Sequence, residues 1–163
     1  MKKGLFILFL FVSIDFASRA QTLRVDNPRS EYASNPLAVE TLAPMFSWEI
    51  QAYEKNMIQS GYRIMVADDS ILLAQDQANV WDSKKIESSD NVQVKYAGKA
   101  LSSSKKYYWK IMVWDSKGEK SGYSKIAHWR MGLLDTKDWN GAQWIAYEEL
   151  ADSNRHVPLM QGN

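Results

Sequence analysis

Apolar and polar residues alternate along much of the chain between residues 22 and 131, and turn-forming residues interrupt the alternation at short intervals. A period of two places successive side chains on opposite faces of a strand, and helical spacing is scarce. The alternation is carried by segments 22–25, 45–50, 61–67, 80–83, 92–96, 107–114 and 123–131. This pattern predicts antiparallel β-structure with about seven strands. One short helix is expected near residues 71–75, because Asp68, Asp69 and Ser70 offer oxygens that cap helices.

The longest alternation predicts a central strand with two distinct faces. One face consists of Tyr107, Trp109, Ile111 and Val113, and the other of Tyr108, Lys110, Met112 and Trp114. On the other strands the side chains expected to face the core are Phe46, Trp48, Ile50, Tyr62, Ile64, Val66, Val92, Val94, Tyr96, Ala127, Trp129 and Met131. Leu101 and a polar turn precede Tyr107, which is typical of a tyrosine corner. These features predict an all-β, seven-stranded sandwich of fibronectin type III or immunoglobulin-like class over residues 22–132.

The first 20 residues do not follow the alternating pattern. Lys2 and Lys3 give a positive start, residues 4–14 are an apolar run, and Ser18 and Ala20 are the small residues that a signal peptidase needs. This arrangement predicts a signal peptide over residues 1–20, cleaved near Ala20, and therefore a secreted or periplasmic protein. A spanning helix needs about 20 apolar residues, so no membrane span is expected.

Composition narrows the chemistry that this chain can perform. The 20 basic residues lose Lys2, Lys3 and Arg19 with the leader, and the 19 acidic residues lose Asp15, which leaves 17 basic against 18 acidic side chains. A near-neutral chain does not favour nucleic acid binding. Cysteine is absent, which excludes disulfides, cysteine-ligated zinc and thiol catalysis. The two histidines are too few for a multi-histidine metal site, so neither a metal nor a cofactor is expected.

Paired carboxylates are the first place to look for hydrolytic chemistry. Asp68 and Asp69 precede the predicted helix, where capping is their simplest role. Glu148 and Glu149 are adjacent, and neighbours on a strand point to opposite faces, so they could not act on one substrate. His128 is expected at the surface. No catalytic residue is therefore predicted in this chain.

Aromatic side chains are the remaining candidates for a binding surface. Trp114, Tyr108 and Met112 share the face of the central strand that points away from the core, and could form an exposed apolar stripe. Such stripes mark interfaces, and docking onto a neighbouring domain is favoured over glycan stacking. Trp81 is ambiguous, because it could pack at a sheet edge or stay exposed.

The sequence changes character after Met131. Residues 133–163 are interpreted as a linker and the truncated start of a second β-domain, with Trp139 and Trp144 as its anchors. The last stretch, 148–163, is polar and has too little apolar material to close a second core.

Short motifs follow one another along the chain in a definite order. They are Leu23-Arg24-Val25, Glu31-Tyr32, Asn35-Pro36-Leu37, Pro44-Met45-Phe46-Ser47-Trp48-Glu49, Gly61-Tyr62-Arg63-Ile64, Trp81-Asp82-Ser83-Lys84-Lys85-Ile86, Tyr107-Tyr108-Trp109-Lys110, Val113-Trp114-Asp115, Met131-Gly132-Leu133-Leu134, Trp139 and Ala142-Gln143-Trp144-Ile145. This series resembles the N-terminal region of bacterial α-L-rhamnosidases of glycoside hydrolase family 78. Two aromatic exchanges depart from the pattern: Tyr123 stands where a Trp is expected, and Trp129 where a Phe is expected.

The resemblance implies a fibronectin-type-III-like domain, then a second β-sandwich beginning near Trp144, then a large (α/α)₆ barrel with acidic catalytic residues. The parent activity is hydrolysis of terminal α-L-rhamnose with inversion. None of the barrel positions maps onto this chain, so no catalytic residue is transferred. The implied role is a non-catalytic N-terminal accessory domain whose partners are the later domains of the enzyme. Two alternatives stay open: a stand-alone carbohydrate-binding module for rhamnose-containing glycans, and an inert truncated gene product.

Overall fold

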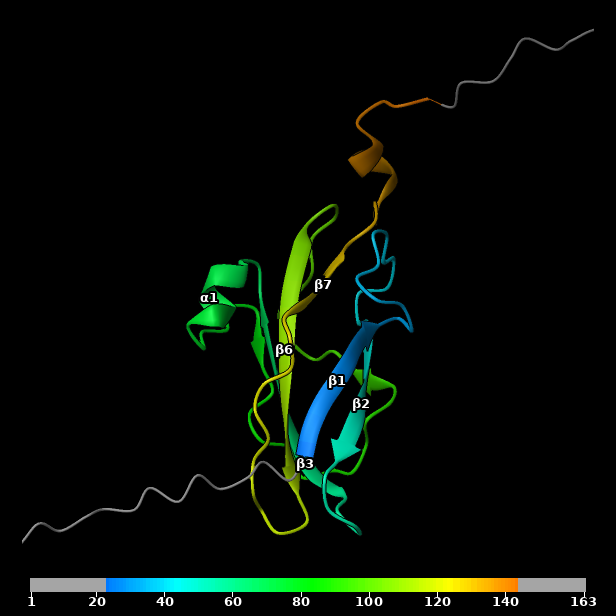
Figure 1. Ribbon diagram of the computed structural model, residues 1–163. Helices are drawn as coiled ribbons and strands as arrows, with labels where there is room; N and C mark the ends of the chain where they lie inside the picture. The colour runs from blue at the N-terminus through cyan, green and yellow to red at the C-terminus, as the bar shows by residue number, and fades with distance from the viewer. Residues whose placement is uncertain (1–22, 144–163) are drawn as a thin grey trace, which may run out of the picture.

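The alternating segments form two antiparallel sheets in the computed structural model, which describes residues 23–143 (Figure 1). The three-stranded sheet has the order β1 (Leu23–Ser30), β2 (Met45–Ala52), β5 (Val94–Lys95). The four-stranded sheet has the order β4 (Trp81–Asp82), β3 (Gln59–Ala67), β6 (Lys106–Asp115), β7 (Ala127–Arg130). Two short helices complete the described chain, α1 (Ser70–Ala74) and the 3₁₀ helix η1 (Thr136–Trp139). The predicted all-β, seven-stranded sandwich is confirmed.

Helix α1 forms where the capping residues predict it. The Asp69 side chain accepts a hydrogen bond from the backbone N–H of Ile71 at 2.8 Å, which satisfies one of the free amides of the first turn. The helix lies over the outer face of β3, where Leu73 packs with Met65 and Ala67 in a small second core. The four-stranded sheet is therefore covered on both faces near α1.

The main core lies between the two sheets and is dominated by aromatic rings. Phe46 lies at its centre, with ring centroids 4.4 Å from Trp109 and 5.5 Å from Trp129. All three side chains are fully buried. The predicted inward face of β6, which carries Tyr107, Trp109, Ile111 and Val113, is buried throughout. Because the chain has no cysteine, close packing of these large rings stabilises the sandwich without disulfides.

The prediction that Val92 shares the core face with Val94 and Tyr96 is wrong. Val92 is 60% exposed, whereas Val94 and Tyr96 are buried. The backbone of Gln93, between them, has a φ of 55°, in the left-handed region. Strict alternation of faces requires extended backbone, so this one residue breaks the pattern.

The predicted strand 123–131 is wrong in its first half, because only Ala127–Arg130 forms β7. Before it, the hydroxyls of Ser121 and Ser124 accept hydrogen bonds from the β6 amides of Val113 (3.0 Å) and Ile111 (3.2 Å). Side-chain oxygens thus replace the backbone carbonyls that a regular ladder would use. The segment 121–126 still follows β6, but as an irregular strap.

Strand β1 is longer than the predicted segment 22–25. It continues to Ser30 through a register shift between Asp26 and Arg29 in its pairing with β2. Asn27 adopts a φ of 52°, and Pro28 cannot donate a ladder hydrogen bond. The bulge absorbs both residues, so the Asn-Pro pair bends the strand without ending it.

Tyr107 makes the backbone contact that a tyrosine corner requires. Its hydroxyl accepts a hydrogen bond from the backbone N–H of Ser102 at 2.9 Å, and Leu101 beside that turn is buried. Tyr107→Phe is expected to lower the free energy of unfolding by about 1–2 kcal/mol, because the amide would lose its acceptor. Urea titrations of both proteins measure this, with Tyr53→Phe at an exposed position as the matched control. Equal midpoints for Tyr107→Phe and the unsubstituted chain would show that the bond contributes nothing.

Within residues 23–143, no helix is both long enough and apolar enough to cross a membrane.

Candidate functional site

The outer face of the four-stranded sheet brings together the aromatic candidates and several charged side chains. Pairing between β3 and β6 sets Trp114 opposite Gly61, Met112 opposite Arg63, and Tyr108 opposite Ala67. On its other side Tyr108 lies opposite His128 of β7. The predicted stripe therefore runs along the middle of this face, between two flanking strands.

The stripe is less exposed than its pattern predicts. Met112 is only 8% exposed, so the expectation that it lies open to solvent is wrong. Its cross-strand neighbour is the long side chain of Arg63, and the strap 121–126 follows β6 on the other side. Trp114 and Tyr108 are half-buried. Sequence periodicity shows which way these side chains point, but not what covers them.

Three rings on or beside this face are each covered by a lysine of the same chain. The ammonium of Lys85 lies 5.2 Å from the ring centroid of Trp114, and that of Lys106 lies 5.0 Å from Tyr108. A third pair joins Lys110 to the ring of Tyr123 in the strap, at 4.1 Å. Each pair gains cation–π attraction. A sugar ring that stacked on Trp114 or Tyr108 would have to displace an ammonium group.

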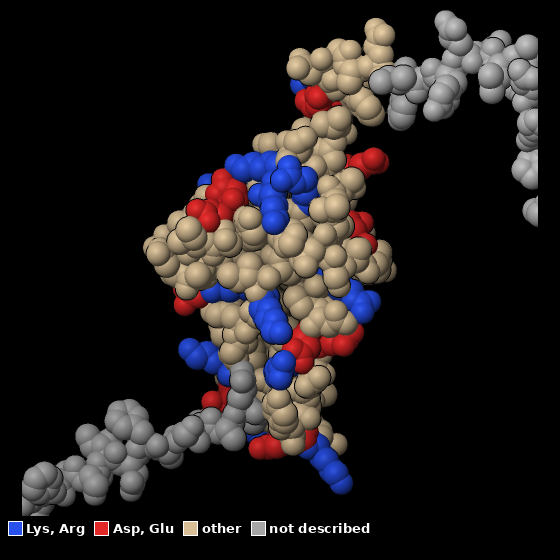
Figure 2. Space-filling view, turned by 45° about the horizontal axis from the view of Figure 1, so that its top comes forward, with Lys and Arg blue, Asp and Glu red and all other residues tan. Residues whose placement is uncertain are grey.

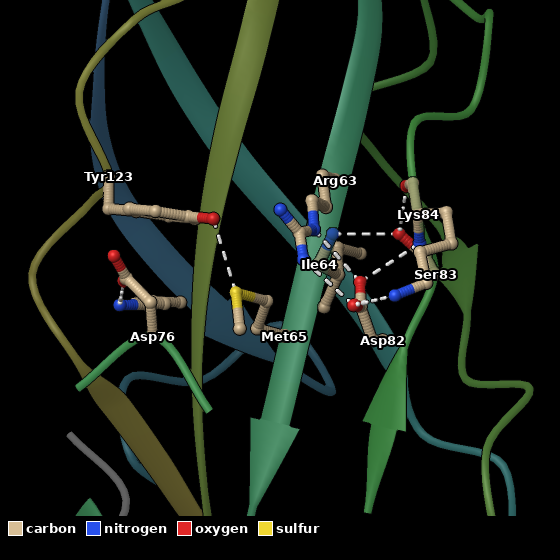
Figure 3. Close-up of polar contacts among 9 residues, drawn as sticks. Arg63, Ile64, Met65, Asp76, Asp82, Ser83, Lys84 and Tyr123 are labelled. Carbon is tan, nitrogen blue, oxygen red and sulfur yellow. Dashed lines mark hydrogen bonds and ion pairs between the residues drawn. The ribbon is translucent and has the colours of Figure 1, made fainter. Parts of the chain in front are cut away.

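Asp82 binds two basic side chains, Arg63 and Lys84, at the edge of the same face (Figure 3). Its carboxylate accepts two hydrogen bonds from the Arg63 guanidinium, at 2.9 and 2.8 Å, and one from the Lys84 ammonium at 2.6 Å. The backbone N–H of Lys84 donates a fourth bond, at 3.0 Å. The Arg63 hydrogen bonds, with help from Lys84, hold the pKa of Asp82 well below its usual range. This carboxylate is fully engaged and is suited to structure, not to proton transfer.

Asp82→Asn is expected to lower the free energy of unfolding by about 1–2 kcal/mol at neutral pH, because a paired, half-buried charge is lost. The folded-state pKa of Asp82 is depressed, so its stabilisation is present above the unfolded-state pKa near 3.8 and is lost as the pH falls towards the folded-state value. The difference between the two proteins should therefore shrink below about pH 4. Urea titrations from pH 7 to pH 2.5 measure it, with Glu87→Gln as an exposed control; a difference that did not depend on pH would contradict this account.

Lys110 and Tyr123 join the face to helix α1. Lys110 is buried and donates hydrogen bonds to the Leu73 carbonyl oxygen and to the Asp76 carboxylate. The Tyr123 hydroxyl donates to the Met65 sulfur at 3.2 Å (Figure 3), and burial is the main cause that raises the pKa of Tyr123. Sequence reasoning assigned no role to Lys110, although a lysine inside an apolar strand was the available signal.

Among the other predicted residues, Trp81 and Asp68 occupy structural positions. Trp81 packs at the sheet edge, where its ring centroid lies 6.2 Å from that of Phe46 and 5.2 Å from that of Tyr96. Of the two alternatives for Trp81, packing at the edge is therefore the one that the structure shows. Asp68 pairs with Lys105 at 2.7 Å. Trp139 ends η1 and is 43% exposed. Trp144, Glu148, Glu149 and His156 lie outside the described residues.

Two further observations bear on chemistry. His128 is half-buried, and burial, together with the nearby Lys106, lowers its pKa. In the part of the chain that the structure describes, no three His, Asp or Glu side chains gather in a way that could hold a metal ion. The face is therefore a packed surface of rings, lysines and ion pairs.

Comparisons with known proteins give one consistent result. The family described as "Rha78A-like, N-terminal immunoglobulin domain" matches residues 25–135. An α-L-rhamnosidase of Formosa agariphila is 39% identical over 148 residues, which cover 88% of this chain and 16% of that protein. An α-L-rhamnosidase of Streptomyces avermitilis is 36% identical over 124 residues, covering 76% of this chain and 12% of that protein.

Solved structures agree with the sequence relatives. The structure of α-L-rhamnosidase from Dictyoglumus thermophilum superposes with a TM-score of 0.73 at 35% identity, over 77% of this chain and 14% of that one. The Streptomyces avermitilis α-L-rhamnosidase complexed with L-rhamnose gives a TM-score of 0.68 at 36% identity, over 72% of this chain and 11% of that one. The chain thus spans less than a fifth of the length of each of these relatives.

Proposed function

Because the chain belongs to the Rha78A-like N-terminal immunoglobulin domains, we propose that it is the non-catalytic N-terminal accessory domain of a longer α-L-rhamnosidase. In that enzyme it would pack on the later domains, and the later domains would remove terminal α-L-rhamnose from glycans or glycosides.

The observation that carries the proposal is the pattern of similarity. Relatives that share 39% and 36% identity with this chain are α-L-rhamnosidases, and the matched region is a small fraction of each. The hydrogen bonds of the described carboxylates also favour a structural role for this domain. The half-buried carboxylate of Asp82 is held by Arg63 and Lys84, the buried carboxylate of Asp115 accepts from two backbone amides, and Asp69 caps a helix. Groups engaged in this way hold a fold together and are not free to exchange protons with a substrate.

The proposal includes export from the cytoplasm. Residues 1–20 carry the positive start, apolar run and small residues of a secretory signal. Fractionation of the producing cells, followed by sequencing of the protein's N-terminus, tests this. A periplasmic or secreted protein that begins at Gln21 is the expected result, and a cytoplasmic protein that begins at Met1 would overturn it.

The mass of the native polypeptide tests the accessory role. An antibody raised against residues 23–143 should capture, from the producing organism, a polypeptide several times heavier than the 18.7 kDa of this chain. Peptide mass spectrometry should find both residues 23–143 and later sequence in the captured band. A native product of 18.7 kDa or less would overturn the proposal and leave the binding-module and inert-product alternatives.

Rhamnose-bearing oligosaccharides are expected to leave the tryptophan fluorescence of this chain unchanged up to about 1 mM, a limit that corresponds to about 4 kcal/mol of binding. The physical reason is that the Trp114 ring is covered by the Lys85 ammonium and Trp81 packs against Phe46. Fluorescence titration measures this, and Trp114→Ala serves as the paired variant. A saturating signal that disappears in Trp114→Ala would instead favour the stand-alone carbohydrate-binding module.

A further inference from the structure

We propose that the end of the sandwich from which the chain runs on past residue 143 is the surface that docks onto the next domain of the same polypeptide. This inference rests on the proposed function and names the docking surface. We define the exit surface by four exposed apolar side chains in two segments at this end, namely Leu37, Leu42, Leu133 and Trp139. In Figure 1 the loop between β1 and β2 and the segment 132–143 lie at the same end of the molecule.

The chain leaves the sandwich between two loops that hold it. The Gly132 N–H donates to the Val39 carbonyl oxygen at 2.8 Å, and the Val39 N–H donates to the Arg130 carbonyl oxygen at 3.0 Å. On the other side, the Ser104 N–H donates to the Gly132 carbonyl oxygen at 3.1 Å. The position and direction of residue 132 are therefore fixed from both sides.

The next residues are also attached to the sandwich. The Ser103 hydroxyl donates to the Asp138 carboxylate and accepts from the Leu134 N–H at 3.1 Å. Asp138 also accepts from the Asp135 N–H at 3.0 Å, which completes the capping box of η1. A flexible linker would not be bonded in this way to a loop more than 30 positions earlier in the chain, since each bond costs the entropy of ordering the segment. The exit is thus built as a rigid joint.

Apolar exposure at this end is large. Leu37, Leu42, Trp139 and Leu133 are 74%, 62%, 43% and 39% exposed. In Figure 2 the projecting end that leads to the C-terminal grey trace is mostly tan, with few charged side chains. Exposed apolar side chains from two segments at the same end of the molecule indicate an interaction site. The outer sheet face differs, because its rings are already covered by Lys85 and Lys106.

The occupant that these observations favour is the continuing polypeptide. The matched relatives are more than six times longer than the shared region, since that region is 16% or less of each. A domain that begins where a rigid joint ends is held beside the exit surface at high effective concentration, which a separate partner or a second copy would have to exceed.

Hydrogen exchange tests the proposal in the native longer polypeptide and in the 163-residue chain. Amides in peptides covering 34–44 and 131–143 should exchange at least about tenfold more slowly in the longer polypeptide. Control peptides covering 54–60 and 70–76 contain Ile58 and Ile71, which are 65% and 63% exposed, and should exchange equally in both proteins. Slower exchange in the control peptides alone, or on the outer sheet face alone, would overturn the proposal, as would equal exchange everywhere.

A matched pair of variants in the longer polypeptide sharpens the test. Leu42→Ser should restore at least about threefold faster exchange in peptide 131–143, whereas Ile58→Ser, at nearly equal exposure, should not. Equal effects of the two variants would overturn the proposal. Exchange does not depend on catalysis, so a longer polypeptide that shows the protection but releases no rhamnose would refute the proposed function and keep the docking surface.

Discussion

Phe46→Ala is expected to lower the free energy of unfolding by about 3–5 kcal/mol, the range for truncating a buried ring. Phe46 is fully buried and lies within 4.4–6.4 Å, between ring centroids, of four other aromatic side chains, three on the opposite sheet and one directly after β5. Those four rings are Trp81, Tyr96, Trp109 and Trp129. Its removal would leave a cavity that rigid rings cannot easily fill, and the chain has no disulfide to compensate.

Urea titration followed by tryptophan fluorescence measures this effect, with Ile58→Ala at an exposed position as the control. The control should change the free energy of unfolding by no more than about 0.5 kcal/mol. A loss below about 1 kcal/mol for Phe46→Ala would mean that the aromatic cluster collapses around the gap and that Phe46 is not its centre.

Gly98→Ala is expected to lower the free energy of unfolding by about 3 kcal/mol, at the upper end of the cost of overpacking. An added Cβ would lie 2.5 Å from the Trp81 Cβ and 2.5 Å from the Tyr96 hydroxyl oxygen. Tyr96 is buried and its hydroxyl donates to the Lys99 carbonyl oxygen at 2.6 Å, and the Trp81 ring packs against Phe46 and Tyr96, so neither side chain can move freely. The glycine is needed here for close approach, since its φ is not in the left-handed region.

Differential scanning calorimetry of Gly98→Ala and of Ala100→Ser, an exposed neighbour, measures the difference. Gly98→Ala should melt at a clearly lower temperature, and Ala100→Ser should melt close to the unsubstituted chain. Equal melting temperatures would contradict the packing described around Trp81 and Tyr96.

The strands that could be predicted are those whose faces depend on extended backbone alone. Central strand β6 is an example, because its inward side chains from Tyr107 to Val113 are buried throughout. The two incorrect strand predictions, for Val92 and for the start of strand 123–131, arise where one residue leaves the extended conformation or a side chain replaces a backbone hydrogen bond. The left-handed backbone of Gln93 turns Val92 outward, and the hydroxyls of Ser121 and Ser124 take the place of ladder carbonyls. A pattern with a period of two predicts neither a left-handed residue nor a side chain that accepts a ladder hydrogen bond.

The candidate site was less predictable, because its contacts join distant parts of the chain. Alternation shows that Trp114 and Met112 point away from the core. It does not show that Lys85 lies over Trp114, nor that Arg63 lies opposite Met112 and binds Asp82. The motif that begins at Trp81 could be recognised in the sequence, but the roles of its residues are seen only in the fold. Trp81 is partly buried and packs against the core, and Asp82 binds Arg63 of the neighbouring strand.

The exit surface could not be identified from the sequence for the same reason. Leu37 and Leu42 lie in a loop with no regular pattern, and Trp139 was interpreted as an anchor of the following domain. Only the fold shows that this loop is bonded to the end of the last strand, since Val39 pairs with Arg130 and Gly132. In our proposal the next domain covers the exit surface, and the sheet face that carries Lys85 and Lys106 stays in contact with solvent. This arrangement suits a domain that is followed by a longer polypeptide.

Our central proposal is that this chain is an accessory domain of a longer α-L-rhamnosidase and does not itself hydrolyse rhamnosides. The most direct test is the rate at which L-rhamnose is released from an aryl α-L-rhamnoside by the 163-residue chain and by the native polypeptide that contains it, at equal molar concentration. The account predicts release by the native polypeptide and no release above the uncatalysed rate by the 163-residue chain. Release by the 163-residue chain, or none by the native polypeptide, would contradict it.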